Sequence, residues 1–132
     1  MGVGKLEALA SALQRSWSAE TSSTPDWTET NRAKGQCAVT ACVVQDYFGG
    51  DILNTVATLP SNETVSHYFN VIGGETIDLT RGQFPEGTTF TRPTAKLGRY
   101  SSTREYCLSY ENTRLRYEEL RGRVAKNFRV NE

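Results

Sequence analysis

The chain has 132 residues and a mass of 14.7 kDa, and its fifteen Lys and Arg residues balance fifteen Asp and Glu residues. This length fits one hydrophobic core, so we expect a single domain over residues 1–132. The formal net charge of zero argues against a nucleic-acid-binding or membrane-surface protein. No apolar run approaches the roughly 20 residues of a membrane-spanning helix, and no secretory signal opens the chain, so we expect a cytoplasmic protein.

The chain contains three cysteines and one histidine. An odd, scattered set of cysteines argues against a disulfide scaffold. A single histidine excludes a metal site built on several imidazoles, and no C-x-x-C spacing supports zinc. We therefore expect neither a metal nor a cofactor.

Charge is distributed unevenly along the chain. Residues 1–70 contain four Lys or Arg and seven Asp or Glu, whereas residues 71–132 contain eleven and eight. Six basic residues between Arg114 and Arg129 could form a patch for anionic ligands. They could equally be the solvated face of a helix whose C-terminal cations suit its dipole. The zero net charge favours the second interpretation and also favours self-association.

The first part of the sequence predicts two helices joined by a polar loop. Apolar residues at helical spacing predict an amphipathic helix over residues 3–17, and residues 18–34 are polar and typical of a loop. Residues 36–48 are apolar on nearly all sides and end at Gly49-Gly50, which is a good helix stop. This segment therefore predicts a buried central helix.

The rest of the sequence predicts a small sheet followed by two helices. Strands are expected at residues 51–59, in a hairpin with arms 65–72 and 75–80, and in a short stretch at 88–91. Ser102 to Glu105 has a capping-box pattern, and Asn112 is expected to cap the last helix. We expect the buried side of that helix to carry Tyr117, Leu120, Val124 and Phe128. The predicted fold is α+β, with a central buried helix packed on a small antiparallel sheet with flanking helices.

Cys37 is predicted at the first turn of the buried central helix. The free N–H groups and the dipole at a helix N-terminus favour a thiolate, and the same N–H groups can stabilise a tetrahedral oxyanion. A cysteine at this place can also be a small buried hydrophobe. Cys42 lies roughly 140° round the helix from Cys37, and Cys107 lies in another element, so we expect both to be packing residues.

The predicted hairpin brings the single histidine to a carboxylate. If Gly73 and Gly74 form a two-residue turn, His67 and Asp78 are diagonal neighbours on one face of the sheet. A three-residue turn would place them on opposite faces. Cys37, His67 and Asp78 are therefore a candidate triad of nucleophile, general base and orienting carboxylate.

Two amide side chains are candidates for an oxyanion donor beside the backbone N–H of Cys37. Asn31 lies six residues before Cys37, and Gln36 immediately precedes it. Both could instead be ordinary loop or helix-cap residues.

These residues resemble two known groups of proteins. A Cys opening a central helix, followed by His and Asp on neighbouring antiparallel strands, is similar to the papain-like superfamily in transglutaminase order. The stretches 35–41, 45–50, 66–68 and 77–80, together with Gln83-Phe84, resemble the small bacterial YunG-like family. The resemblance implies a minimal papain-like domain and a Cys-His-Asp triad. In papain-like enzymes an amide side chain six residues before the nucleophile helps form the oxyanion hole, and Asn31 stands there in place of the more usual Gln.

The expected function is a cysteine-dependent hydrolase or an acyl or amide transferase. The chain is much smaller than a typical papain-like protease or transglutaminase, so we expect a small-molecule, peptide or carrier-bound amide or ester as substrate. The alternative is a catalytically silent papain-like module with a binding or accessory role. Neither hypothesis involves a nucleic acid or a membrane.

Overall fold

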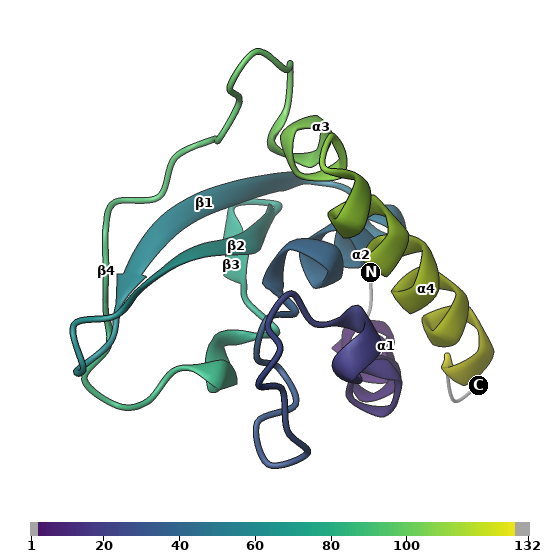
Figure 1. Ribbon diagram of the computed structural model, residues 1–132. Coiled ribbons are helices and arrows are strands. Elements are labelled where there is room, and N and C mark those ends of the chain that lie inside the picture. Colours follow the sequence, from purple (N-terminus) through teal and green to yellow (C-terminus); the bar gives the residue numbers. More distant parts are fainter. Residues whose placement is uncertain (1–2, 129–132) are drawn as a thin grey trace.

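A computed structural model describes residues 3–128 of the chain. Four helices gather on one side of a curled antiparallel sheet of four strands, and the chain passes from the first two helices through the sheet to the last two (Figure 1). The α+β class predicted from the sequence is confirmed. No helix within residues 3–128 is both long enough and apolar enough to cross a membrane.

The sheet has the strand order β3-β2-β1-β4. The two long strands β1 (Asp51–Thr58) and β2 (Thr64–Ile72) form its centre, and the short strands β3 (Glu75–Ile77) and β4 (Thr89–Phe90) pair along their outer edges. All the pairings are antiparallel.

The β2–β3 hairpin has the two-residue turn that the sequence predicts. Ile72 pairs with Glu75, and both Gly73 (φ 58°) and Gly74 (φ 83°) have positive φ, as a type I′ turn requires. The second arm ends at Ile77, so our prediction that it continues to Thr80 is wrong. Its ladder ends because the Asp78 carboxylate turns to His67 and the Asp78 carbonyl accepts from Arg81 in the short 3₁₀ turn η2 (Arg81–Gln83).

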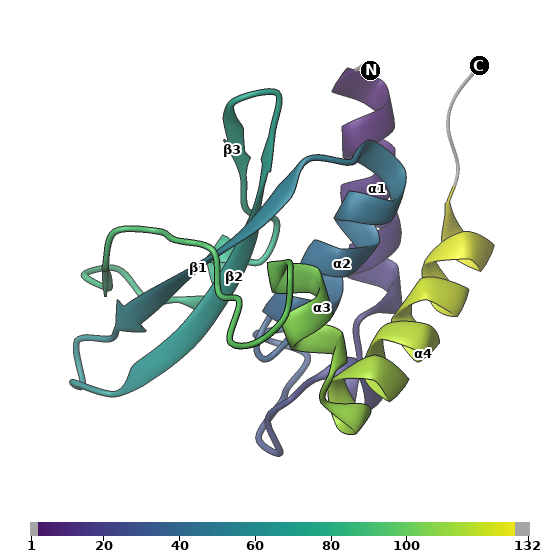
Figure 2. The ribbon, with the colours of Figure 1, turned by 90° about the horizontal axis from the view of Figure 1, so that it is seen from above.

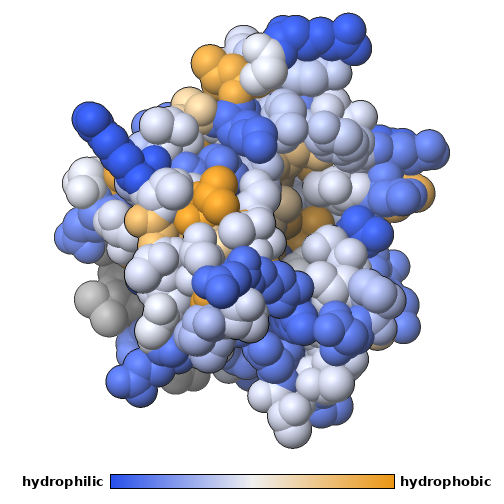
Figure 3. All heavy atoms as spheres, turned by 60° about the vertical axis from the view of Figure 1, so that its left-hand side comes forward, coloured by the Kyte–Doolittle hydropathy of each residue, from blue (hydrophilic) through white to orange (hydrophobic). Residues whose placement is uncertain are grey.

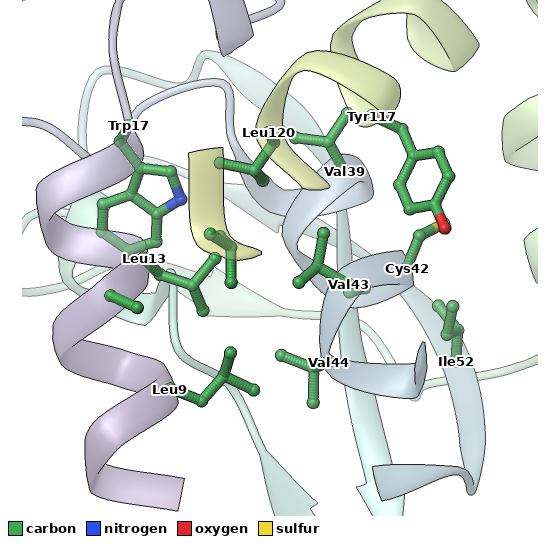
Figure 4. Close-up of a cluster of buried hydrophobic side chains, with 13 residues drawn as sticks. Leu9, Leu13, Trp17, Val39, Cys42, Val43, Val44, Ile52, Tyr117 and Leu120 are labelled. Carbon is green, nitrogen blue, oxygen red and sulfur yellow. The ribbon is translucent and has the colours of Figure 1, made fainter. Parts of the chain in front are cut away.

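The helix α2 (Cys37–Phe48) lies between the sheet and the two long outer helices, α1 (Val3–Ser16) and α4 (Glu111–Asn127) (Figure 2). Apolar side chains from α1 and the residue that follows it meet those of α2, β1 and α4 in one buried cluster (Figure 4). The main members of this cluster are Leu9, Leu13, Trp17, Val39, Val43, Val44, Ile52, Tyr117, Leu120 and Val124. The prediction of a buried central helix is confirmed, because α2 contributes to the core on most of its sides.

Polar contacts hold α2 to its neighbours at three points. The indole N–H of Trp17 donates to Thr40 Oγ1 (2.9 Å), and the Asn70 side chain of β2 donates to the Ala41 carbonyl (2.9 Å). Arg104, on α3 (Thr103–Leu108), forms an ion pair with Asp46 (2.8 Å). These contacts hold α2 to the end of α1, to β2 and to α3, and the bond from Asn70 ties it to the strand that carries His67.

The structure corrects the predicted caps of the last two helices. Ser102 does cap α3 by accepting from the backbone N–H of Glu105 (3.1 Å), but the carboxylate of Glu105 accepts from the Ser101 hydroxyl. The last helix begins at Glu111 with Tyr110 as its N-cap, so the prediction that Asn112 caps it is wrong. The polar loop that we expected over residues 18–34 contains one 3₁₀ turn, η1 (Ala19–Thr21).

The face of the molecule on the sheet side shows apolar side chains only in small groups separated by polar ones (Figure 3). A long irregular segment, residues 91–102, passes from β4 over the sheet to α3 (Figure 1). The expected strand at residues 88–91 is confirmed as β4, with two residues in place of four.

A close backbone approach positions the start of α2. The Ser23 N–H donates to the Gly35 carbonyl (2.9 Å), and the Ser22 hydroxyl donates to the Lys34 carbonyl (2.7 Å). Gly35 has a φ of +74°, and a Cβ at this residue would collide with Ser22 Oγ and lie 2.9 Å from the Ser23 nitrogen. Glycine is therefore required at residue 35 by both its φ and its neighbours.

We predict that Gly35→Ala destabilises the protein more than Gly73→Ala. Gly73 also has a positive φ, of +58°, but nothing lies within 4 Å of its Cβ position. The alanine at residue 73 should cost about 1 kcal/mol of unfolding free energy from backbone strain, and the alanine at residue 35 about 1–3 kcal/mol more from overpacking. Urea unfolding of the two variants measures the difference. Equal losses would contradict the close approach at Gly35.

Candidate active site

Cys37 is the first residue of α2, and its side chain lies at the helix N-terminus. The first backbone hydrogen bond of the helix runs from the Thr40 N–H to the Gln36 carbonyl (2.9 Å). The N–H groups of Cys37 and Ala38 therefore lack intrahelical acceptors. The Cys37 thiol is 8% exposed and donates to the Ser66 carbonyl of β2 (3.8 Å).

His67 and Asp78 form a buried hydrogen-bonded pair. His67 Nε2 lies 2.7 Å from Asp78 Oδ2, and their side chains are 0% and 8% exposed. The hydrogen bond predicted from the hairpin parity is confirmed, although Asp78 follows β3 and is not part of it. Since a carboxylate only accepts, Nε2 carries the proton that is shared with Asp78.

The other ring nitrogen of His67 is left for a different partner. Nδ1 is buried and has no hydrogen-bond partner among residues 3–128. Burial lowers the pKa of His67, but the hydrogen bond to Asp78 and the interactions with Cys37 outweigh it and raise that pKa to about 9. The imidazole thus has a carboxylate on one edge and, within the described part of the chain, a buried nitrogen without a partner on the other.

Aromatic rings enclose the imidazole. The edge of Phe84 meets the His67 ring at a centroid distance of 4.9 Å, and Phe69 and Phe90 lie at 6.1 and 6.2 Å. The Arg81 guanidinium lies over the Phe90 ring and 3.8 Å from the Asp78 carboxylate. These groups exclude water from the His67–Asp78 pair and so strengthen its electrostatic interaction.

A cavity of about 870 Å³ opens onto Cys37. Its walls come from the loop before α2, from the start of β2, and from the segment around η2. The wall residues that bear on the site are Asn31, Gly35, Cys37, Ser66, Gln83 and Phe84. The volume suits a small molecule or a few residues of peptide.

The structure separates the two candidate oxyanion donors. Asn31 lines the cavity with Cys37, and one N–H of its amide donates to the Gln83 carbonyl (3.2 Å). Gln36 is fully buried, is not among the residues lining that cavity, and donates its amide N–H to the Ser18 carbonyl (3.0 Å). Of the two amides, only Asn31 lies in the wall of this cavity.

The site depends on one residue that sequence reasoning did not assign, Gln83. Its amide donates to the Thr80 carbonyl (3.0 Å), and its Oε1 accepts from the Gly35 N–H (3.4 Å). Together with the contact from Asn31, these bonds join the loop before Cys37 to the segment that carries Asp78. In the sequence, the one signal for this residue was the resemblance of Gln83-Phe84 to the YunG-like family.

The remaining cysteines belong to the packed interior. Cys42 is 0% exposed and Cys107 is 4% exposed, and burial raises the pKa of each thiol to about 12. All three cysteines are free thiols. Among the described residues, no group of three or more His, Cys, Asp or Glu side chains is arranged to hold a metal ion.

Comparison with known proteins identifies relatives by sequence. The model of the YunG protein family matches residues 5–129. The chain is 40% identical over 79 residues to the YunG protein of Bacillus subtilis (strain 168), which is described as uncharacterized. This match spans 60% of the chain and 63% of the Bacillus protein. No solved structure matches the chain.

The raised pKa of His67 predicts a pH-dependent stability. The pKa of His67 is about 9 in the folded protein and 6.5 for an ordinary histidine. Protonation of His67 therefore stabilises the folded state fully below pH 6.5, and this stabilisation is lost as the pH rises through 9. We expect the wild type to lose about 3 kcal/mol of unfolding free energy over this window relative to His67→Gln. Urea unfolding of both proteins at several pH values measures the loss. Parallel pH profiles would contradict the interpretation.

Proposed function

This chain belongs to the YunG family, and we propose that it is a cysteine-dependent hydrolase or an acyl or amide transferase. Its substrate would be an amide or ester that is small, peptidic or linked to a carrier. Cys37 would be the nucleophile, His67 the general base and acid, and Asp78 the residue that orients the imidazole.

The observation that carries the proposal is the buried His67 ring, which is hydrogen-bonded to Asp78 and has its second nitrogen left without a partner among the described residues. Nε2 is bonded to Asp78, Nδ1 is buried without a partner, and Cys37 raises the pKa of the same imidazole. A buried histidine that served only packing would have both ring nitrogens hydrogen-bonded, whereas Nδ1 of His67 is left unpaired within residues 3–128. The cavity at Cys37 supplies the room for a substrate.

The proposed reaction has two halves. The Cys37 thiolate attacks the substrate carbonyl, and His67 gives its proton to the leaving amine or alcohol as the C–N or C–O bond breaks, which leaves a thioester on Cys37. Water or an acceptor nucleophile then attacks the thioester, His67 takes the proton of that nucleophile, and the Cys37 thiolate leaves. The Asp78 carboxylate stays ionised and keeps the imidazole in the tautomer that both halves need.

The negative charge that forms on the carbonyl oxygen needs donors on the same side of Cys37. The free N–H of Cys37 at the helix N-terminus and the second N–H of Asn31 are the two donors that we assign. Gln36 supports the site in another way, since its bond to Ser18 joins the start of α2 to the loop after α1.

We infer that this minimal domain is related to the papain-like superfamily. The support is the chain order of Cys37 on a central helix, then His67 and Asp78 from adjoining parts of an antiparallel hairpin. We also propose that the protein acts in the cytoplasm, where its three free thiols stay reduced.

We predict that iodoacetamide alkylates Cys37 at least about 100-fold faster than Cys42 or Cys107 at neutral pH, because burial raises the pKa of the Cys42 and Cys107 thiols to about 12, whereas Cys37 opens onto a cavity and has His67 as its proposed base. The variants His67→Ala and Asp78→Asn should both slow the labelling of Cys37. Mass spectrometry of peptides after timed labelling measures each rate, and circular dichroism checks that the variants are folded.

Equal and slow labelling of the three thiols in the folded wild type would overturn the proposal. The protein would then be a binding or accessory module that keeps the same fold. Fast labelling that neither variant changes would show that Cys37 is exposed in solution without help from His67.

We predict that Asn31→Ala slows acylation of Cys37 by p-nitrophenyl acetate about 100-fold. The same variant should leave alkylation by iodoacetamide unchanged, because alkylation forms no oxyanion. Thr30→Ala is the matched control, since Thr30 lines the same cavity but carries no amide. The burst of p-nitrophenolate measures acylation. An equal fall in both rates, or no fall in acylation, would remove Asn31 from the proposed oxyanion hole.

A further inference from the structure

Two smaller cavities adjoin the large cavity near Cys37. A second cavity of about 170 Å³ shares Cys37, Gly35 and Ser66 with the first and is closed by Thr113 and Arg116 of α4. A third, of about 250 Å³, shares Ser66 and Thr113 with the second. Cys37 therefore lies where a large cavity meets a row of two small ones.

The two small cavities differ from the large one in charge. Arg116 lines the second cavity and Lys96 the third, and no Asp or Glu is among the described residues that line either. The large cavity, by contrast, has Asp26 and Glu63 in its wall together with Lys34. The second and third cavities, which we call the cationic arm, therefore have only Arg116 and Lys96 as charged residues in their walls, within residues 3–128, and lie on the side of α4.

Arg116 has no carboxylate partner within residues 3–128, unlike Arg121 and Arg123 of the same helix, and it is half-buried, unlike the exposed and likewise unpaired Arg114. Arg121 pairs with Glu118 (2.9 Å), and Arg123 pairs with Glu119 (2.7 Å). Arg116 is half-buried and forms no ion pair within residues 3–128. Lys96 is also half-buried, and its ammonium lies 5.6 Å from the centre of the Tyr106 ring with no carboxylate beside it. Half-buried cations that face a cavity without counter-charges attract an anionic group.

We propose that this arm binds a carboxylate of the substrate, so that the protein acts on amides or esters that carry a carboxylate near the reacting carbonyl. The inference rests on the proposed function of Cys37. The planar fork of Arg116 matches the two oxygens of a carboxylate, and Lys96 adds attraction further along the arm.

The test uses two alkylating probes that differ only in charge, N-bromoacetylglycine and its neutral amide, N-bromoacetylglycinamide. The measured quantity is the ratio of their rate constants at Cys37, since effects on the thiol itself cancel in the ratio. We expect Arg116→Gln to lower this ratio about tenfold, with the neutral probe unaffected. Arg116→Lys should keep part of the effect, and Lys96→Gln should lower the ratio less than Arg116→Gln.

Arg114→Gln is the matched control, because Arg114 lies on the same helix, is exposed and lines neither small cavity. An unchanged ratio in Arg116→Gln, or an equal fall in Arg114→Gln, would overturn the carboxylate site while leaving the nucleophile in place. If Cys37 reacts with the neutral probe no faster than Cys42 and Cys107, the proposed function fails instead. The two failures are therefore distinguishable in one data set.

Discussion

The hydrogen bond between His67 and Asp78 is the interaction on which the account of this protein depends. It joins β2 to the segment that follows β3, and both partners are almost completely buried. A buried carboxylate or imidazolium without its partner would be costly, so the pair stabilises the fold only while both members are present. The same bond leaves Nδ1 buried without a hydrogen-bond partner among residues 3–128, and Cys37 raises the pKa of the same ring. The His67–Asp78 hydrogen bond therefore serves both the stability of the fold and the proposed chemistry.

The rest of the fold holds the partners of this bond in position. Helix α2 is packed between the sheet and the outer helices, so its first residue cannot move independently of β2. Gln83 connects the loop before Cys37 to the Asp78 segment, and Phe84 closes the space over the imidazole. The site is thus formed by three segments that are distant in sequence, each fixed by the core or by buried hydrogen bonds.

Local patterns were sufficient to predict the parts of the site that depend on local geometry. The apolar run that ends at Gly49-Gly50 predicted α2 with Cys37 at its start, and the Gly73-Gly74 turn set the parity that brings His67 to Asp78. These predictions succeeded because helix ends and two-residue turns follow from a few neighbouring residues.

Features that depend on tertiary packing could not be predicted in this way. Gln83 acts through backbone groups of Gly35 and Thr80, and no periodicity marks it. Gln36 faces Ser18, which only the packing of α1 against α2 determines. The last helix begins at Glu111 with Tyr110 as its N-cap, although Asn112 is the better capping residue, so residue preference alone did not predict this start. The place of Arg116 in the wall of a cavity beside Cys37 follows only from the packing of α4 near β2 and the start of α2.

The most direct test of the central claim is an NMR titration of the imidazole of His67. The chain has only one histidine, so its ring signals need no further assignment. The account predicts that the ring stays protonated through neutral pH, with a pKa raised to about 9, and that Asp78→Asn and Cys37→Ala each lower this pKa. A ring that titrates at the ordinary value of 6.5 in all three proteins would contradict the account.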